Sequence, residues 1–290
     1  MYSTLTACYP AMYVKVEGDR LFLPTGGGGK TGIPKQHATI TARLTEPAPT
    51  AYREIAISRD ARGYYFASFT DEQPDIPLEE TTEILAFDLG IKTLATGVNT
   101  SGRIFHIGGF KGGNWYNRQL DKIRSKRDRC QKKSRRYIRL SETYQRVSEK
   151  KRNKHTDCLH KASSLIAYRL VARTVVIGDL SQRQMVTKAR QEKQKKNKRL
   201  HRAVFNDWGL YRFVQMLDYK CLHAGKSLQR IDERYTSKDC SACGSRQDMP
   251  LWKRTYRCGT CGLVMDRDEN SAVNILQRFL ARLGPHASLT

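Results

Sequence analysis

The sequence predicts an α/β protein that carries a small metal-binding insertion and is preceded by an all-β segment. Short apolar strands at 84–92 and 174–180 are separated by long helical patterns. Two Cys-x-x-Cys pairs stand close together within residues 240–261. Residues 1 to about 80 alternate strand patterns with turn signals. At 290 residues the chain is long enough for a sizeable core and one or two domains.

Two β-hairpins are expected in the first 80 residues. They pair residues 12–16 with 20–23 around Gly18-Asp19, and residues 54–58 with 64–69 around residues 60–63. The glycine run at 26–29 lies between them and precedes Lys30. Because the spacing of a phosphate-binding loop and the apolar helix after it are both missing, this run is predicted to be a connecting loop.

The strand at 84–92 carries a single acid, Asp88, and a second strand follows at 94–98. A carboxylate inside an apolar run is costly to bury unless it binds a metal or accepts hydrogen bonds. Near the C-terminus, either Asp266 or Asp268 can cap a helix whose apolar face includes Ala272, Val273, Leu276 and Phe279. Asp88 and an acid of the 266–268 segment, although far apart in the sequence, would both be accommodated if they held one shared metal site.

A strongly basic helical stretch is predicted from 117 to about 155. Ile123, Cys130, Tyr137 and Tyr144 recur at every seventh position, which predicts a seam for a partner helix. The other faces carry Arg124, Lys126, Arg127, Arg129, Lys132, Lys133, Arg135, Arg136 and Arg139. A solvated helix would pair such charges with acids along the helix, so the preferred interpretation is a surface that follows nucleic-acid phosphates. A merely solvated charged helix is the alternative.

A further helix at about 157–173 leads into the strand at 174–180. Residues 181–202 are basic with little apolar content, and we expect them to order on nucleic acid. The nucleic-acid-binding residues predicted here are Lys195, Lys196, Lys198 and Arg199. Residues 205–217 have apolar side chains at helical spacing, which predicts a buried amphipathic helix; base stacking by Trp208 is the less favoured alternative.

Four cysteines have the spacing of a structural zinc site: Cys240, Cys243, Cys258 and Cys261. Gly244 and Gly262 each follow a pair and can supply a turn with positive φ. Disulfides are disfavoured because the first residues lack the pattern of a secretory signal, so a reducing compartment is expected. With four protein ligands the site has no open position, so one zinc ion is expected to hold a ribbon together and to perform no chemistry.

The charge of the chain indicates an anionic partner. There are 52 Lys and Arg against 28 Asp and Glu, which gives a net charge of +24. Nucleic acid is the usual polyanion, although a cationic protein of membrane surfaces would share this excess. No apolar run approaches the roughly twenty residues that a membrane span needs. We therefore expect a cytoplasmic, nucleoid-associated protein without a membrane partner.

Several motifs, in order, resemble the TnpB family of transposon-encoded proteins, relatives of type V CRISPR effectors and eukaryotic Fanzor proteins. They are DLGIKTLATGV from Asp88, YTSKDCSACG from Tyr235, the second cysteine pair, and DRDENSAVNIL from Asp266. The resemblance covers roughly residues 84 to 280. It implies an RNase H-like, RuvC-type nuclease domain with an inserted zinc ribbon.

The resemblance also implies a division of the chain. The expected parts are a partial β-barrel wedge domain at 1–80, the nuclease domain at 81–235 with a basic helical insertion at 111–160, the zinc ribbon at 236–264, and the last nuclease motif at 265–290. Family members carry an earlier wedge strand and a helical recognition lobe. The chain is therefore expected to be N-terminally truncated relative to the family.

One position departs from the family pattern. Most members end the second nuclease strand with Glu-Asp-Leu, whereas this chain has Gly178 followed by Asp179 and Leu180. Metal-pair nucleases need several carboxylates. Three interpretations stay open: Glu233 replaces the missing acid, as in some relatives; Asp179 replaces it, although strand alternation points it away; or the site is inactive.

The resemblance implies an RNA-guided, metal-dependent DNA endonuclease of a mobile element that cleaves phosphodiester bonds by a two-metal mechanism. Asp88, Glu233 and Asp268 would be the catalytic residues and would hold up to two Mg²⁺ or Mn²⁺ ions. The partners would be a guide RNA from the same element and double-stranded target DNA with its displaced strand. The alternative is an inactive or truncated relative that only binds RNA or DNA. A DNA-joining transposase is a weaker third class, because no Tyr or Ser nucleophile context is present.

Overall fold

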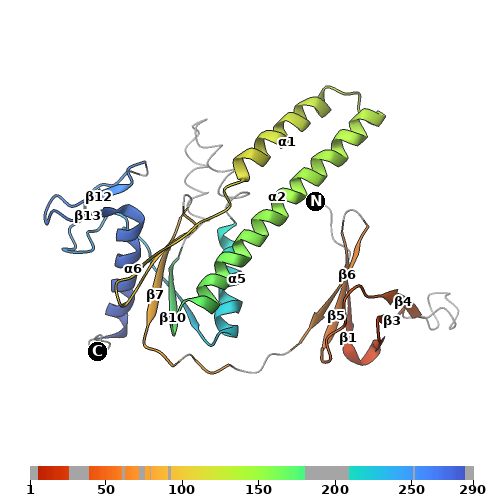
Figure 1. The fold of residues 1–290 in the computed structure, drawn as a ribbon, viewed down its shortest axis with the longest axis horizontal. Coiled ribbons are helices and arrows are strands. Elements are labelled where there is room, and N and C mark those ends of the chain that lie inside the picture. Colours follow the sequence, from red (N-terminus) through yellow and green to blue (C-terminus); the bar gives the residue numbers. More distant parts are fainter. Residues whose placement is uncertain are drawn as a thin grey trace. The chain divides into compact units, whose positions relative to one another are not determined.

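The computed structural model describes residues 6–25, 39–60, 63–71, 76–78, 80–90, 93–179, 209–250 and 252–284. The chain divides into two compact units, Met1–Asp75 and Ile76–Thr290 (Figure 1). No helix within the described ranges is long and apolar enough to cross a membrane. The predicted nucleic-acid-binding residues Lys195, Lys196, Lys198 and Arg199 lie outside the described residues, as does Trp208.

The first unit is all-β in its described part. Its strands are β1 (Thr6–Pro10), β2 (Lys15–Glu17), β3 (Arg20–Pro24), β4 (Thr39–Arg43), β5 (Glu54–Arg59) and β6 (Tyr65–Thr70). They form two antiparallel sheets in the orders β1-β5-β6 and β2-β3-β4. Leu21 and Leu23 of β3 and Ile55 of β5 are buried together, so the two sheets share one small core.

Both predicted hairpins are present, with one correction. β2 pairs with β3 around Gly18, which has a φ of 59°, and β5 pairs with β6. The strand predicted at 12–16 begins only at Lys15, because Ala11–Tyr13 forms a short 3₁₀ turn, η1. The amide of Val14 donates to the carbonyl of Ala11 and closes this turn.

The second unit is built around a mixed sheet. Its strands are β7 (Ile84–Leu89), β8 (Ala95–Asn99), β9 (Ile104–Ile107), β10 (Thr174–Gly178) and β11 (Ser227–Ile231). Among the described residues they lie in the order β11-β10-β7-β8-β9. β7, β8 and β9 are antiparallel, whereas β10 is parallel to both β7 and β11. This arrangement confirms the mixed α/β architecture and has the strand order of the RNase H fold.

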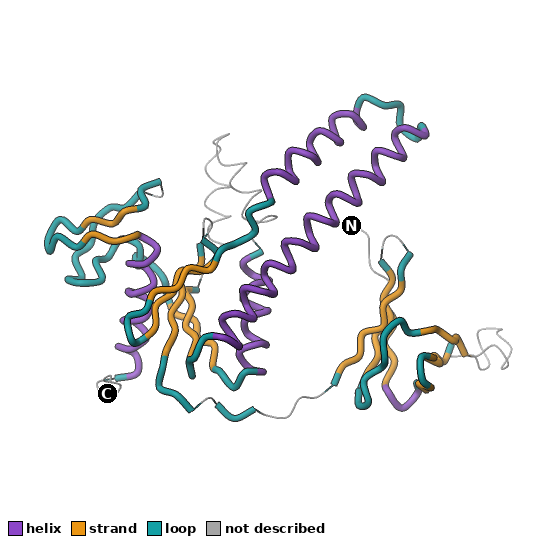
Figure 2. Tube along the Cα trace, in the orientation of Figure 1, coloured by secondary structure: helices purple, strands orange, loops and turns teal. Residues whose placement is uncertain are grey.

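The helical elements of the second unit are α1 (Gly113–Asp128), α2 (Arg135–Ser164), the π-helical turn η3 (Leu165–Arg169), α5 (Leu210–His223) and α6 (Arg267–Leu283). α2 and α5 cover one face of the sheet and α6 covers the other, whereas α1 packs on α2. Leu85 and Phe87 of β7 pack with residues of α2 and α5, whereas Ala86 packs with residues of α6. Figure 2 shows the strands between these two helical layers. Because side chains alternate along a strand, Asp88 lies on the α6 face with Ala86.

The basic stretch predicted at 117–155 is helical but interrupted, and the helix predicted at about 157–173 is not a separate helix. α1 and α2 form a helical hairpin with a break at 129–134, and α2 continues to Ser164. Lys133 takes a positive φ of 68° and the Ser134 hydroxyl accepts from the amide of Tyr137, which starts α2. The predicted seam is the contact between the two helices: Arg127 of α1 lies over the rings of Tyr137 and Tyr144.

Candidate metal centres

The four cysteines form one cluster. Their sulfur atoms all lie within 4.8 Å of one another, and two pairs, Cys240 with Cys261 and Cys243 with Cys258, are 3.6 Å apart. Tetrahedral thiolates at a Zn–S distance of about 2.3 Å would stand about 3.8 Å apart. The donor set and the spacing therefore fit a structural zinc ion.

Each cysteine pair is folded by the same backbone bonds. The amide of Cys240 donates to Ser245 and the amide of Gly244 returns to Cys240; Cys258, Leu263 and Gly262 repeat this pattern. Gly244 and Gly262 have φ values of 74° and 75°, which confirms their predicted role. Strands β12 (Thr255–Arg257) and β13 (Val264–Asp266) pair on either side of the second cysteine pair, Cys258 and Cys261.

Hydrogen bonds favour the thiolate form of one ligand. The hydroxyl of Ser245 and then the amides of Cys261 and Thr260 donate to Cys258, and they lower the pKa of this thiol to about 5. Zinc binds thiolates, so this ligand is ready for the ion at neutral pH.

A second candidate centre lies at the C-terminal end of β7 and β10. In the parallel register Ile177 pairs with Phe87, so Gly178 follows beside Asp88 on the α6 face of the sheet. Position 178 is where the family pattern places its glutamate. Glycine leaves an empty position next to Asp88.

The side chain of Glu233 fills that position. A Cβ added at Gly178 would lie 2.3 Å from Oε2 and 2.9 Å from Cβ of Glu233. Glu233 follows the end of β11 by two residues, and β11 pairs with β10 so that Ile231 is opposite Gly178. Its Oε2 is buried and has no hydrogen-bond partner among the described residues. The Glu233 side chain therefore fills the space that a side chain at position 178 would need, so only glycine fits at 178 while Glu233 stays in place.

Asp268 approaches from α6. Asp266 caps this helix by accepting from the amide of Asp268 at 2.8 Å, which selects Asp266 from the two predicted caps. The Asp268 carboxylate is buried and pairs with Arg267 at 2.9 Å and with Arg254, from the ribbon, at 3.2 Å. Two guanidinium groups thus neutralise Asp268 in this state.

The carboxylates influence one another. Burial raises the pKa of Asp88 well above its usual range, and Glu233 and Asp268 raise it further through charge repulsion. Burial, followed by Asp179 and Asp232, raises the pKa of Glu233 to about 7. Such acids would lose their protons on binding a cation, because the cation stabilises the ionised forms.

Asp88, Glu233 and Asp268 are thus brought into one region, although not to common ligand distance. Among the described residues, only the four cysteines form a group of three or more metal-binding side chains within 4.8 Å. The three oxygen donors, the partnerless Oε2 of Glu233 and the space above Gly178 nevertheless fit a hard divalent cation such as Mg²⁺. Asp179 follows the end of β10 and its side chain is exposed, although its charge lies close enough to raise the pKa of Glu233.

Sequence reasoning missed the polar residues of α6 that hold the segment between β11 and the ribbon. The side-chain amides of Asn270 and Asn274 each donate to the carbonyls of Thr236 and Asp239, at distances of 2.8 to 3.3 Å. Arg278 binds further carbonyls of the same segment. Asn270 and Asn274 are four residues apart and so lie on one face of the helix, but the sequence alone does not indicate which carbonyls they bind.

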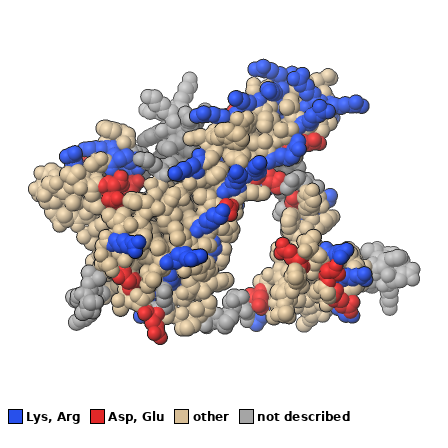
Figure 3. Space-filling view, in the orientation of Figure 1, with Lys and Arg blue, Asp and Glu red and all other residues tan. Residues whose placement is uncertain are grey.

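The predicted basic surface lies on the α1–α2 hairpin. Figure 3 shows Lys and Arg gathered over these two helices. The exposed members are Arg124, Lys126, Arg129, Lys132, Lys133, Arg135, Arg136 and Arg139. Arg127 is half-buried, pairs with Asp128 at 2.9 Å and contacts the two tyrosine rings, so it already holds the hairpin together.

Two family models match the chain. Residues 68–189 match the OrfB_IS605 family, described as "Probable transposase", and residues 211–275 match the "Cas12f1-like, TNB domain". The first match covers β7 to β10 with the helical hairpin. The second covers Glu233, all four cysteines and Asp268.

Relatives with curated names are also similar. A Streptomyces pristinaespiralis protein named "Putative RNA-guided DNA endonuclease" is 32% identical over 89% of this chain and 61% of its own length. The TnpB-like protein MJ0751 of Methanocaldococcus jannaschii is 30% identical over 53% of each chain. The chain thus spans about half to three-fifths of these two relatives. A solved Cas12f1-sgRNA-target DNA complex is similar at 17% identity with a TM-score of 0.47, over 91% of this chain and 69% of that chain.

Proposed function

Because the chain belongs to the TnpB/OrfB family, we propose that it is an RNA-guided DNA endonuclease that cleaves phosphodiester bonds with divalent metal ions. In this proposal residues 76–290 form a RuvC-like nuclease domain with its zinc ribbon, and the first unit is part of a wedge domain. Its partners are a guide RNA and double-stranded target DNA. The printed names of the relatives support this activity class.

The observation that carries the proposal is the position of Glu233 over Gly178. A carboxylate lies beside the position at which the family pattern has a glutamate, although it comes from the segment after β11 and not from β10. A buried carboxylate oxygen without a partner costs free energy, so its retention is explained if a cation binds there. This argues for a relocated acid.

The chain's residues then have distinct tasks. Asp88, on the central strand, and Glu233, beside it, would hold ions at the C-terminal ends of β7 and β10. Asp268 would complete the site from α6. Bound divalent ions would supply an activated water and neutralise charge on the phosphate. Arg254 and Arg267 would have to release Asp268, at least in part, for this carboxylate to act as a ligand. The exposed basic residues of α1 and α2 would contact phosphates of RNA or DNA.

A second function is favoured by one observation. Asp268 is neutralised by two guanidinium groups, and the three carboxylates are not within common ligand distance. A chain fixed in this arrangement would bind nucleic acid without cutting it.

A cleavage assay with the guide RNA, target DNA and Mg²⁺ separates the two functions. The nuclease proposal expects cleavage that is abolished by Asp88→Ala and by Glu233→Gln, while RNA binding is retained. Asp179→Asn is the matched control, since this exposed acid is near Glu233 but outside the proposed ligand set, and it should leave cleavage intact. Binding without any cleavage by the unaltered chain would favour the second function.

A further inference from the structure

We propose that Arg278 of α6 is a positioning residue for Glu233. It holds the backbone on both sides of Glu233 and so keeps the carboxylate in the space above Gly178. The inference rests on the proposed function in one respect, which is the assignment of Glu233 as a metal ligand.

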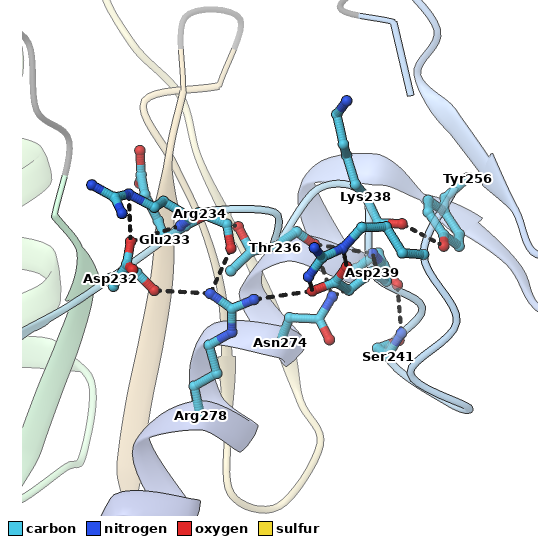
Figure 4. A network of polar contacts seen from close by, with 12 residues as sticks. Asp232, Glu233, Arg234, Thr236, Lys238, Asp239, Ser241, Tyr256, Asn274 and Arg278 are labelled. Carbon is cyan, nitrogen blue, oxygen red and sulfur yellow. Dashed lines mark hydrogen bonds and ion pairs between the residues drawn. The ribbon is translucent and has the colours of Figure 1, made fainter. Parts of the chain in front are cut away.

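One guanidinium group binds both carbonyls that flank Glu233. Nη1 of Arg278 donates to the carbonyl of Asp232 at 3.0 Å and to that of Arg234 at 2.7 Å (Figure 4). Nη2 donates to the carboxylate of Asp239 at 3.1 Å. Because the guanidinium is planar and its donors are fixed relative to one another, these contacts set the course of the backbone through residue 233.

Glu233 needs such a restraint. The last sheet bond near it joins the amide of Asp179 to the carbonyl of Ile231, and the strand β11 ends there. Asp232 and Arg234 are exposed on either side. The Glu233 carboxylate is partly desolvated and lies near the negative charges of Asp179 and Asp232, so a loose segment would let it turn out into water.

α6 is suited to provide the restraint because it also carries Asp268. Arg278 lies ten residues further along the same helix, and a helix is a rigid spacer. Arg278 is itself oriented by Asp239, which the guanidinium of Arg246 holds at 2.6 and 3.1 Å. One helix therefore sets the positions of two proposed ligands relative to each other.

Three variants and one control test the inference. Arg278→Gln removes the guanidinium, and Arg278→Lys keeps a charged donor that can reach carbonyls. Arg282→Gln removes the same charge from an exposed position one turn further along α6, so it is the matched control. Asp239→Asn weakens the ribbon contacts of Arg278 but leaves its bonds to the two flanking carbonyls.

The first measurement is amide hydrogen exchange in residues 232–236 without divalent metal. The amide of Thr236 reports directly, because it donates to the carbonyl of Glu233 at 3.2 Å. Arg278→Gln is expected to speed exchange in this segment by about tenfold or more, with little change in the strands of the sheet. Arg282→Gln is expected to stay within about twofold of the unaltered chain.

The second measurement is Mn²⁺ binding, followed by electron paramagnetic resonance in the absence of nucleic acid. Arg278→Gln is expected to weaken binding by about 10- to 100-fold, as is usual when a residue that orients a ligand is lost. Arg278→Lys should fall between this variant and the unaltered chain. Asp239→Asn should lower thermal stability but change the Mn²⁺ affinity by less than about threefold. If Arg278 affected Mn²⁺ binding only through overall stability, Asp239→Asn would weaken Mn²⁺ binding as well.

The outcomes separate this inference from the proposed function. If Asp88→Asn abolishes Mn²⁺ binding but Arg278→Gln does not change it, the site exists and the positioning role is overturned. If Asp88→Asn has no effect on Mn²⁺ binding, the proposed metal site fails. In that case hydrogen exchange decides alone: faster exchange confined to 232–236 supports positioning of residue 233, and unchanged exchange refutes it.

Discussion

Replacing Gly178 with alanine adds one methyl group at the point where β10 meets the Glu233 side chain. The new Cβ would stand 2.3 Å from Oε2 and 2.9 Å from Cβ of Glu233, so one of the two side chains has to move. Gly178 is not among the glycines with a positive φ, so its backbone suits alanine as well. The cost of Gly178→Ala therefore comes from the overlap and not from the backbone.

The magnitude follows from two opposing effects. Overpacking a filled site costs about 1–3 kcal/mol in the free energy of unfolding. Where no overlap exists, Gly→Ala stabilises by about 0.4–1 kcal/mol through the unfolded chain. Gly178→Ala should hence destabilise the unaltered protein more than it destabilises Glu233→Ala, because that variant removes the overlap with Oε2 and keeps only the Cβ contact of 2.9 Å. The coupling between the two positions should be about 1 kcal/mol, which lies in the range for residues in contact.

Urea unfolding of the two single variants, the double variant and the unaltered chain measures this coupling. Zinc should be present, and other divalent metals should be absent. Gly108→Ala is the matched control, because a Cβ there would meet no atom within 4 Å, and it should show no coupling to Glu233→Ala. If the effects of Gly178→Ala and Glu233→Ala add within about 0.5 kcal/mol, Glu233 does not occupy the space above Gly178 and the reasoning is refuted.

Three further predictions concern protons, zinc and phosphates. The raised pKa of Glu233 means that the folded chain holds a proton that the unfolded chain releases, so without divalent metal this contribution to stability is present near pH 4.5 and is lost as the pH rises to about 7. Over this window the unaltered chain should lose up to about 3 kcal/mol relative to Glu233→Gln in urea titrations, and parallel curves for the two proteins would contradict the burial of this acid. Elemental analysis should find about one zinc ion per chain, and Cys258→Ser should lose it together with thermal stability; retained zinc would rule out the four-cysteine site. Replacing Arg135, Arg136 and Arg139 together with Gln should reduce the slope of log affinity against log salt by up to about 2.7, equally for unrelated nucleic-acid sequences, whereas an unchanged slope would show that these residues do not contact phosphates.

Parts of the site could be predicted because their residues are unusual in their local sequence. Asp88 is an acid inside an apolar strand, and the structure places it on the face of the sheet that α6 covers. The cysteine pairs and the glycines after them have the spacing of a four-cysteine zinc site, and the structure brings the four sulfur atoms together. In both cases a local pattern carried enough information.

The helical hairpin could not be predicted from the seven-residue repeat. Ile123 on α1 and Tyr137 on α2 have the same seven-residue spacing from Cys130, although Cys130 itself lies in the break at 129–134. The segment contains neither glycine nor proline, and its turn depends on Lys133 taking a positive φ. A continuous helix satisfied the sequence equally well.

The relation of Glu233 to Gly178 depends on strand register. Only the parallel pairing of Ile231 with Gly178 brings the segment after β11 over the glycine, and a shift by one residue would turn the side chains to the other face. The carbonyls of Asp232 and Arg234 that Arg278 binds are likewise 46 and 44 residues away in the sequence. Such contacts are set by the packing of α6 and the sheet, which no local pattern records.

The most direct test of the relocated acid is a crystal of the chain soaked in Mn²⁺ and analysed by anomalous diffraction. The account predicts one or two ions contacted by the carboxylates of Asp88, Glu233 and Asp268, with Arg254 moved away from Asp268. No ion in this region, or ions held by Asp88 and Asp268 while Glu233 turns into solvent, would contradict it.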